Sequence, residues 1–191
     1  MPADLTPSQT LGPFFHDAML RDDGTNVLAG PGVEGELVRI EGRVVDGAGD
    51  PVDDALVEVW QANRHGRYRH PADDRDLPLD PDFVGWGRSG TDGDGIFWFV
   101  TVKPGGVPHP DGGEQAPHLL VTVQARGLLD RLLTRLYFAD EDANASDPVL
   151  SAVPADRRGT LVAARDDSGD VPTYRFDIRL QGDGETVFFA A

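Results

Sequence analysis

The hydrophobic residues of this chain fall in short runs, and several of these runs alternate with polar residues in the pattern of β-strands. Residues 37–45 and 55–62 alternate imperfectly, and residues 96–102 form a β-branched and aromatic run. Further runs of this kind are residues 119–125, 160–164, 174–180 and 185–189. We expect each run to form a strand.

Clusters of glycine, proline and aspartate separate these runs. Residues 46–51 (DGAGDP) and 92–95 (DGDG) are turn signals between neighbouring strands. No long stretch has convincing helical periodicity, and residues 128–136 fit either a short helix or an irregular strand. Many short strands divided by turns predict an all-β sandwich rather than alternating strands and helices.

The first 33 residues differ from the rest because they carry several prolines and glycines and no strand pattern. Such a segment alone would be a solvated tail. Five of its residues are too apolar for that role: Leu11, Phe14, Phe15, Met19 and Leu20. We therefore predict an N-terminal arm, residues 1–33, that packs on a partner chain, and a single β-sandwich domain at residues 34–191.

The charge of the chain excludes several classes of partner. There are 33 acidic and 17 basic residues, for a formal net charge of −16. This balance argues against nucleic acid, which needs a basic face, and against anionic membrane surfaces. There is no cysteine, and no leader or membrane-spanning run is evident, so we expect a cytoplasmic protein without disulfides or thiolate chemistry. An anionic ligand would need a locally positive spot, which gives individual arginines unusual weight.

Several separated motifs resemble the intradiol ring-cleaving dioxygenases. They are residues 57–70 (VEVWQANRHGRYRH), 78–81 (PLDP), 91–103 (TDGDGIFWFVTVK), 104–106 (PGG) and 116–118 (APH). The resemblance implies a transthyretin-like β-sandwich. It also implies a reaction in which ferric iron, held by two tyrosines and two histidines, activates a catechol so that O₂ is inserted between its two hydroxyl-bearing carbons.

The same resemblance implies that this chain has lost half of its iron ligands. Tyr68 keeps the family's spacing of eight residues from the motif tryptophan, and His118 occupies the first histidine position. Val107 stands where the family has its second tyrosine, and Leu120 where it has its second histidine. Gln115 replaces an arginine of the family's catalysts. The four ligand positions are therefore expected to be vestigial, with no metal and no catalytic residue in this chain.

Both ends of the chain and one internal stretch resemble a particular kind of subunit within this family. Residues 6–15 (TPSQTLGPFF), 125–138 and 174–189 resemble the alpha-type subunits of hetero-oligomeric members of this family. An alpha subunit shares its fold with a homologous beta subunit that holds the Fe(III), and completes the beta subunit's pocket for an aromatic acid and O₂. These are the partner, cofactor and substrates that the resemblance implies.

Five residues are the candidates for contact with the substrate. In the family the S-Q-T-x-G-P segment reaches into the partner's active site, which points to Thr10, Gly12, Pro13 and the following Phe14. Glycine allows close backbone approach and proline stiffens the wall. An arm used only for assembly is the alternative. Arg126 is the candidate for the substrate carboxylate, because a guanidinium binds a carboxylate in a bidentate manner.

Several alternatives stay open at this point. Arg135 competes with Arg126 for the carboxylate, and either arginine could make a surface ion pair instead. The whole chain could be an iron-free binding or structural module without an enzymatic partner. It could also be a homomeric enzyme with a remodelled metal site that uses His65, His70 or His109. Co-purification with a homologous chain and the metal content of the pure chain distinguish these hypotheses.

Overall fold

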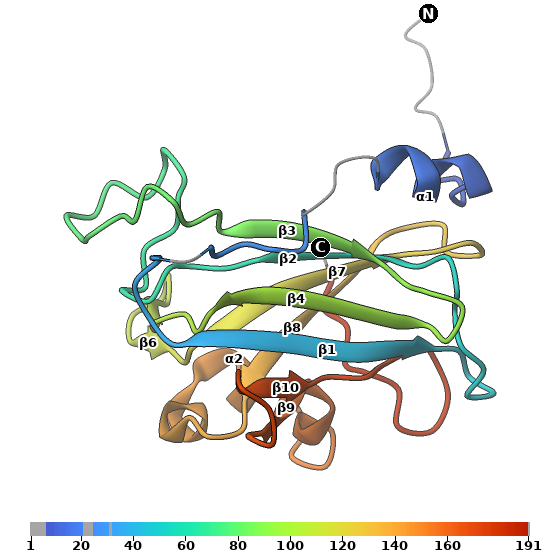
Figure 1. Cartoon of the computed structure of the whole chain (residues 1–191). Helices are drawn as coiled ribbons and strands as arrows, with labels where there is room; N and C mark the ends of the chain where they lie inside the picture. Colours follow the sequence, from blue (N-terminus) through green and yellow to red (C-terminus); the bar gives the residue numbers. More distant parts are fainter. Residues whose placement is uncertain (1–6, 21–24, 31, 191) are drawn as a thin grey trace, which may run out of the picture.

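Strands make up most of the regular structure in the computed structural model, which describes residues 7–20, 25–30 and 32–190 (Figure 1). The strands are β1 (Leu37–Val45), β2 (Leu56–Trp60), β3 (Trp86–Gly90), β4 (Ile96–Val102), β5 (Val107–Pro108), β6 (Glu114–Gln115), β7 (His118–Gln124), β8 (Leu132–Phe138), β9 (Val162–Asp166), β10 (Thr173–Arg175) and β11 (Ile178–Arg179). The helical segments are α1 (Pro13–Met19), the 3-10 helices η1 (Asp142–Ser146) and η2 (Arg158–Leu161), and α2 (Pro148–Ala152). No helix in the described part of the chain is long and apolar enough to cross a membrane.

The main sheet connects nine strands. Its order is β11-β1-β10-β9-β8-β7-β2-β3, and β4 pairs with β1 outside this path. β1 and β4 are antiparallel, with Leu37 opposite Val102 and Arg43 opposite Ile96. β5 and β6 form a separate two-stranded ribbon. In Figure 1, β1 and β4 lie in front of β7 and β8, while β2 and β3 run along the top.

An apolar core lies between the pair β1 and β4 and the group β2, β7 and β8. It is built from alternate residues, because successive side chains of a strand point to opposite faces. Its members include Val38 and Ile40 of β1, Phe97 and Phe99 of β4, Val57 and Val59 of β2, Leu119, Val121 and Val123 of β7, and Leu136 and Phe138 of β8. Each such side chain stabilises the fold by about 1.5–3 kcal/mol when fully buried. The expectation of an all-β fold is confirmed.

The sequence patterns gave several strands correctly. Residues 37–45 and 96–102 form β1 and β4 at the expected bounds, and β2 and β7 begin and end within two residues of theirs. The ambiguous segment 128–136 contains most of a strand, β8, rather than a helix. The run at 160–164 is shifted, because its first two residues belong to η2 and β9 starts at Val162.

The two C-terminal strand predictions were less accurate. Residues 174–180 are divided into β10 and β11, because Phe176 and Asp177 belong to neither strand. The amide of Phe176 donates to the carbonyl of Glu41 in β1. The close approach of Phe176 to β1 requires glycine at position 42, where a Cβ atom would lie 1.7 Å from the Phe176 carbonyl oxygen. Residues 185–189 form no strand, and only Phe189 makes an isolated bridge, to Leu133. The prediction of a strand there was wrong.

The predicted N-terminal arm contains two different parts. α1 is one short helix that starts with Pro13, a residue that suits the first helical turn. Leu28 and Ala29 are buried in the core of this chain, and Ala29 bridges to Phe83, which precedes the edge strand β3. Positions 1–6, 21–24 and 31 of the arm lie outside the described residues. The second part of the arm therefore belongs to the packed domain.

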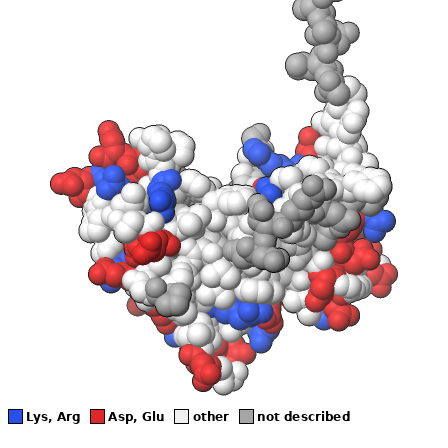
Figure 2. All heavy atoms as spheres, turned by 45° about the horizontal axis from the view of Figure 1, so that its top comes forward, with Lys and Arg blue, Asp and Glu red and all other residues white. Residues whose placement is uncertain are grey.

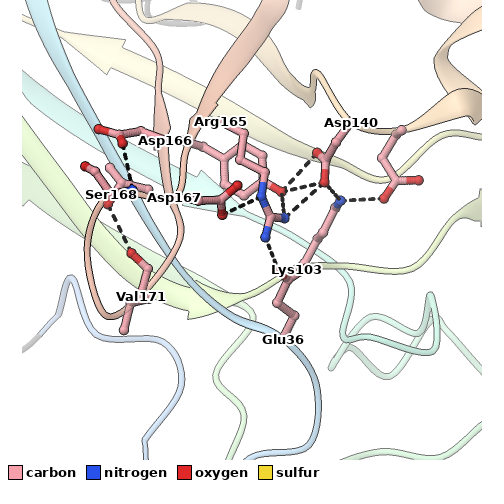
Figure 3. Close-up of polar contacts among 11 residues, drawn as sticks. Glu36, Lys103, Asp140, Arg165, Asp166, Asp167, Ser168 and Val171 are labelled. Atoms are coloured by element: carbon pink, nitrogen blue, oxygen red, sulfur yellow. Dashed lines mark hydrogen bonds and ion pairs between the residues drawn. The ribbon is translucent and has the colours of Figure 1, made fainter.

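A polar network at one end of the sheet joins strands that are distant in sequence (Figure 3). The ammonium of Lys103 lies 2.9 Å from a carboxylate oxygen of Asp140 and 2.6 Å from one of Glu141. Arg165 also contacts Asp140, at 3.0 Å, and donates a hydrogen bond to the hydroxyl of Tyr174. That hydroxyl in turn donates to the carboxylate of Asp140. Burial acts to lower the pKa of Lys103, but the hydrogen bonds to Glu141 and Asp140 outweigh it and raise that pKa.

Replacement of Lys103 by methionine should therefore destabilise the fold. Lys103→Met leaves two carboxylates without their shared cation, and we expect a loss of about 2 kcal/mol in the free energy of unfolding. Arg126→Met is the matched control, because Arg126 also contacts two carboxylates but its side chain is 61% exposed against 11% for Lys103. Urea unfolding should show a loss of about 0.5 kcal/mol or less for the control. Equal losses would contradict the structural role of Lys103.

Candidate functional site

One cavity brings all four vestigial ligand positions together. Its volume is about 620 Å³. Its walls include Tyr68, Val107, His118 and Leu120, together with Trp60, His70, Asp73, Arg75, Gln115 and Arg135. The motif segments, which are far apart in sequence, thus surround one space.

The floor of the cavity is a row of residues across three neighbouring strands. Trp60 of β2 pairs with Leu120 of β7, and Leu120 pairs with Arg135 of β8. His118 lies two residues before Leu120, so both point to the same face of the sheet, and it pairs with Tyr137. Neighbouring strands are about 4.8 Å apart, so Trp60 and Arg135 stand on either side of Leu120. The core occupies the opposite face.

Asn63 and three glycines form the loops above this floor. The carbonyl of Asn63 accepts hydrogen bonds from the amides of Gly66 (3.0 Å) and Gly105 (2.9 Å). Gly66 has a φ of +73°, and a Cβ atom there would lie 1.9 Å from the carbonyl oxygen of Gly106. Only glycine permits this approach of two backbones. The contact holds the loop of Tyr68 against the loop that leads to Val107.

Tyr68 lies on the wall as a neutral phenol. Its ring stacks on that of Trp60, with 5.8 Å between the ring centroids and 6° between the planes. Its backbone amide donates to the carboxylate of Asp73 at 2.8 Å. Burial raises the pKa of Tyr68, and the charge of Arg135 only partly opposes this shift. The side chain is therefore a protonated phenol at neutral pH in this chain.

His118 is also held in its neutral form. Its Nδ1 lies 2.8 Å from the carbonyl oxygen of Ala116, so Nδ1 carries the proton and donates it. Burial, followed by the charge of Arg135, lowers the pKa of His118 to about 4. Its Nε2 is consequently left as a hydrogen-bond acceptor in a wall of the cavity.

A polar chain behind the floor positions Arg135. One guanidinium nitrogen of Arg135 donates to Gln115 Oε1 (2.7 Å) and to the hydroxyl of Tyr137 (3.2 Å). The Tyr137 hydroxyl in turn donates to Asp147 at 3.0 Å. Asp147 is fully buried, and it also accepts from the amides of Ala116 (2.8 Å) and Leu150 (2.7 Å). Arg135 itself forms no ion pair with a carboxylate in the ranges that the structure describes.

The residues of the cavity do not fit a ferric ion. Only Tyr68 and His118 offer donor atoms at the four ligand positions, whereas Val107 and Leu120 present hydrocarbon. Among the described residues, no group of three or more histidine, aspartate or glutamate side chains could hold a metal ion. His70 faces Trp60 edge-on and borders the cavity, while His65 contacts Glu34 on another surface. We therefore assign no iron chemistry to this chain.

The residues predicted to touch the substrate lie at the other end of β7. Gly127 donates its amide to the hydroxyl of Thr10 (2.7 Å), and Gly12 borders a small depression beside Arg126. The guanidinium of Arg126 contacts the carboxylates of Asp53 and Asp54. At about 3.3 Å per residue, this end of the strand is roughly 25 Å from His118. Arg126 thus makes a surface ion pair here, whereas Arg135 faces the cavity.

The two remaining predicted residues belong to α1. Pro13 begins this helix, and the side chain of Phe14 is 85% exposed. The structure therefore brings Thr10, Gly12, Pro13 and Arg126 to one end of the molecule, well away from the vestigial ligand positions.

Sequence reasoning missed the polar chain of Arg135, Tyr137 and Asp147. The alternation of Arg135 and Tyr137 in T-R-L-Y-F is a strand signal that would have placed both side chains on one face. Asp147 had no comparable signal, because the contacts to Ala116 and Tyr137 join segments that are distant in sequence.

Comparison with known proteins identifies the class to which this fold and cavity belong. The family profile described as dioxygenase matches residues 10–182, and the chain is a member of this family, the intradiol ring-cleaving dioxygenases. It is 46% identical to the protocatechuate 3,4-dioxygenase alpha chain of Burkholderia cepacia, with 96% of each chain covered. It is 37% identical to the beta chain of the same organism, with 92% of this chain and 75% of the relative covered. A solved dioxygenase domain from Streptomyces sp. SirexAA-E, part of a carbohydrate-binding fusion protein, is 26% identical with a TM-score of 0.62, over 94% of this chain and 99% of that one.

The pKa of His118 predicts how stability depends on pH. Below pH 6.5 an unfolded chain binds a proton on this histidine, while the folded chain does not until about pH 4. The free energy of unfolding should therefore decrease as the pH is lowered through this window. Between pH 7 and pH 5 the expected loss is about 2 kcal/mol. Urea unfolding at both pH values should show this loss in the wild-type chain and in a His109→Asn control. His118→Asn should remove most of it, and an unchanged pH dependence in that variant would contradict the assignment.

Proposed function

We propose that this chain is the non-catalytic alpha subunit of a protocatechuate 3,4-dioxygenase and completes the active-site pocket of a homologous, iron-bearing beta subunit. The observation that carries this proposal is the presence of Val107 and Leu120 in an otherwise well-formed intradiol cavity. The higher identity to an alpha chain (46%) than to a beta chain (37%) supports the same choice. The domain division is part of the proposal: an arm at residues 1–33 and a transthyretin-like sandwich at residues 34–191.

The reaction would take place at Fe(III) held by the beta subunit. There the iron would make protocatechuate reactive toward O₂, giving 3-carboxy-cis,cis-muconate in the catabolism of aromatic compounds. The alpha subunit would supply walls and charge, since a cofactor depends on protein for binding, orientation and electrostatics. The cytoplasmic location, and the expectation of no nucleic-acid or membrane partner, stay predictions from the sequence.

The arm is the part of this chain that we propose to reach the partner's pocket. Thr10 is fixed to Gly127, and Ser8 donates to Asp130 at 3.1 Å, so the segment before α1 is tied to this chain. Gly12 and Phe14, which follow directly, are both exposed and can face another subunit, and Pro13 between them begins α1. This arrangement supports a wall presented to the neighbouring subunit.

Arg126 remains our proposed ligand for the substrate carboxylate in the shared pocket. It lies at the same end of the molecule as the arm, and its side chain is 61% exposed. Substrate would displace the carboxylates of Asp53 and Asp54, with which it now pairs. Arg135 is the weaker candidate for this role, because it faces the cavity of this chain.

Surface composition supports a protein partner. In Figure 2, acidic side chains lie mainly at the left, the right and the lower edge of the face, and basic side chains lie among the uncharged atoms between them. Large apolar side chains that are at least 36% exposed include Phe14, Val84, Trp86 and Leu129. Such side chains are stabilised when a partner covers them.

The first test is to express this chain alone and together with a homologous beta chain. We expect the lone chain to be colourless and inactive, and the co-expressed complex to contain iron and to consume O₂ when protocatechuate is added. Iron content and oxygen uptake measure both expectations. Iron and turnover in the lone chain would contradict the proposal, and failure of the two chains to associate would favour an independent binding or structural module.

The second test concerns the arm within that complex. Phe14→Ala should raise the KM for protocatechuate roughly 5- to 30-fold, because a buried phenylalanine contributes about 1–2 kcal/mol to such a wall. Leu79→Ala is the control, as Leu79 is a 41% exposed apolar side chain that lies outside the arm. Steady-state oxygen uptake gives KM, and gel filtration gives the assembly state. A weakened assembly with an unchanged KM would mean that the arm serves assembly only.

A further inference from the structure

The cavity of this chain has kept the size and shape of a small-molecule site despite the loss of two ligands. Its volume of about 620 Å³ lies within the range of roughly 300–1,000 Å³ that is typical of ligand pockets. Val107 and Leu120 narrow it without filling it, and both present apolar surface. The proposed function makes no use of this space.

The cavity contains a cation, Arg135, that makes no direct contact with a carboxylate among the described residues. Arg75 is neutralised, because two of its nitrogens lie 2.7 and 2.6 Å from the carboxylate oxygens of Asp73. Asp74 stands on the exposed rim. Arg135 contacts only the neutral oxygens of Gln115 and Tyr137, through a single nitrogen, Nη1.

This arrangement leaves a binding face on Arg135. Its Nε and Nη2 have no hydrogen-bond partner in the portion of the chain described, and they form the edge of a guanidinium that binds a carboxylate in a bidentate manner. A half-buried arginine whose direct contacts are neutral oxygens is electrostatically costly unless an anion joins it. Asp147 lies one hydroxyl away, behind Tyr137, and does not reach this face of the guanidinium. In a chain of net charge −16, a cation whose open edge meets no carboxylate directly suits a site for an anion.

The remaining walls select an aromatic ring. Leu120 lies between Trp60 and Arg135 in the row across the sheet, and Tyr68 stacks parallel to Trp60. A planar ring placed over Leu120 would meet aromatic surface on one side and direct its carboxylate to Arg135 on the other. The apolar side chain of Val107 is a further part of the wall.

His118 adds a requirement for a hydroxyl group. Because its Nδ1 donates to the Ala116 carbonyl, its Nε2 can only accept a hydrogen bond. A phenol hydroxyl on the ring satisfies this acceptor and keeps its proton. A ligand with both a carboxylate and a phenol hydroxyl therefore uses both polar groups of the cavity.

We propose that this cavity is an iron-independent binding site for a hydroxylated aromatic carboxylate, with Arg135 as the carboxylate ligand and His118 as the acceptor for the hydroxyl. The alpha chain would thus bind such a molecule itself, without chemistry, in addition to completing its partner's pocket. The inference does not depend on the proposed function, because it concerns this chain in the absence of a partner and of iron.

Isothermal titration of the purified, metal-free full chain with 4-hydroxybenzoate tests the proposal. We expect one site per chain with a Kd below about 1 mM. Benzoate, which lacks the hydroxyl, should bind several-fold more weakly, and phenol, which lacks the carboxylate, at least about 10-fold more weakly. This series needs no variant. Absence of saturable binding to the folded chain, or equal affinity for phenol and 4-hydroxybenzoate, would overturn the proposal.

Two variants and a matched control locate the site. Arg135→Gln should weaken 4-hydroxybenzoate binding at least about 10-fold, since a charge-assisted, bidentate contact is lost. Leu120→Trp should abolish binding by filling the cavity while Arg135 stays in place. Arg131→Gln, an exposed arginine just before β8, should bind as the wild type does. If Arg131→Gln weakened binding as much as Arg135→Gln, the ligand would be held by general charge and not by this cavity.

Discussion

The side-chain amide of Gln61 is fully buried between the end of β2 and the end of β4. Its hydrogen bonds connect these two strands, and the loop of Tyr68 on the cavity wall starts from this connection. Its nitrogen donates to the carbonyl of Val102 (2.9 Å), and its oxygen accepts from the hydroxyl of Thr101 (2.8 Å). Burying an amide is costly unless its hydrogen bonds are made, so this pair specifies one arrangement of the two strands. Asn63, two residues later, then shapes the loop of Tyr68. The W-Q-A-N block thus sets the frame before any ligand position contributes.

This independence means that the frame does not require metal ligands at Val107 and Leu120. The contacts that hold the loops are backbone approaches at Gly66 and Gly106 and hydrogen bonds of Asn63, and none of them involves Val107 or Leu120. Val107 is 4% exposed, so its substitution for a donor has added apolar burial. A duplicated chain can therefore lose its chemistry while it keeps its shape and the surfaces that a partner recognises.

Much of the fold followed from local patterns, but the site followed only in part. β1 and β4 were predictable because β1 alternates imperfectly, β4 is a β-branched and aromatic run, and turn clusters lie next to both. The break between β10 and β11 was not, because it is imposed by the close passage of Phe176 over Gly42, a contact between distant segments. The four positions matched to iron ligands could be named from motif spacing. The place of Arg135 in the cavity emerged only from cross-strand pairing, and that of Asp147 only from its hydrogen bonds to distant segments.

Asp147 has a consequence for the way the chain reaches its native state. Its carboxylate begins α2 and at the same time binds the segment before β7 and a side chain of β8. Three pieces separated by up to 31 positions must therefore meet before this buried charge is satisfied. If only some of these pieces were in place, the buried carboxylate would lack both water and part of its hydrogen bonds. The segment that covers the outer face of β7 and β8 should therefore fold in one cooperative step. The covering layer and the sheet beneath it would then open together, and the walls of the cavity would persist for as long as the domain does.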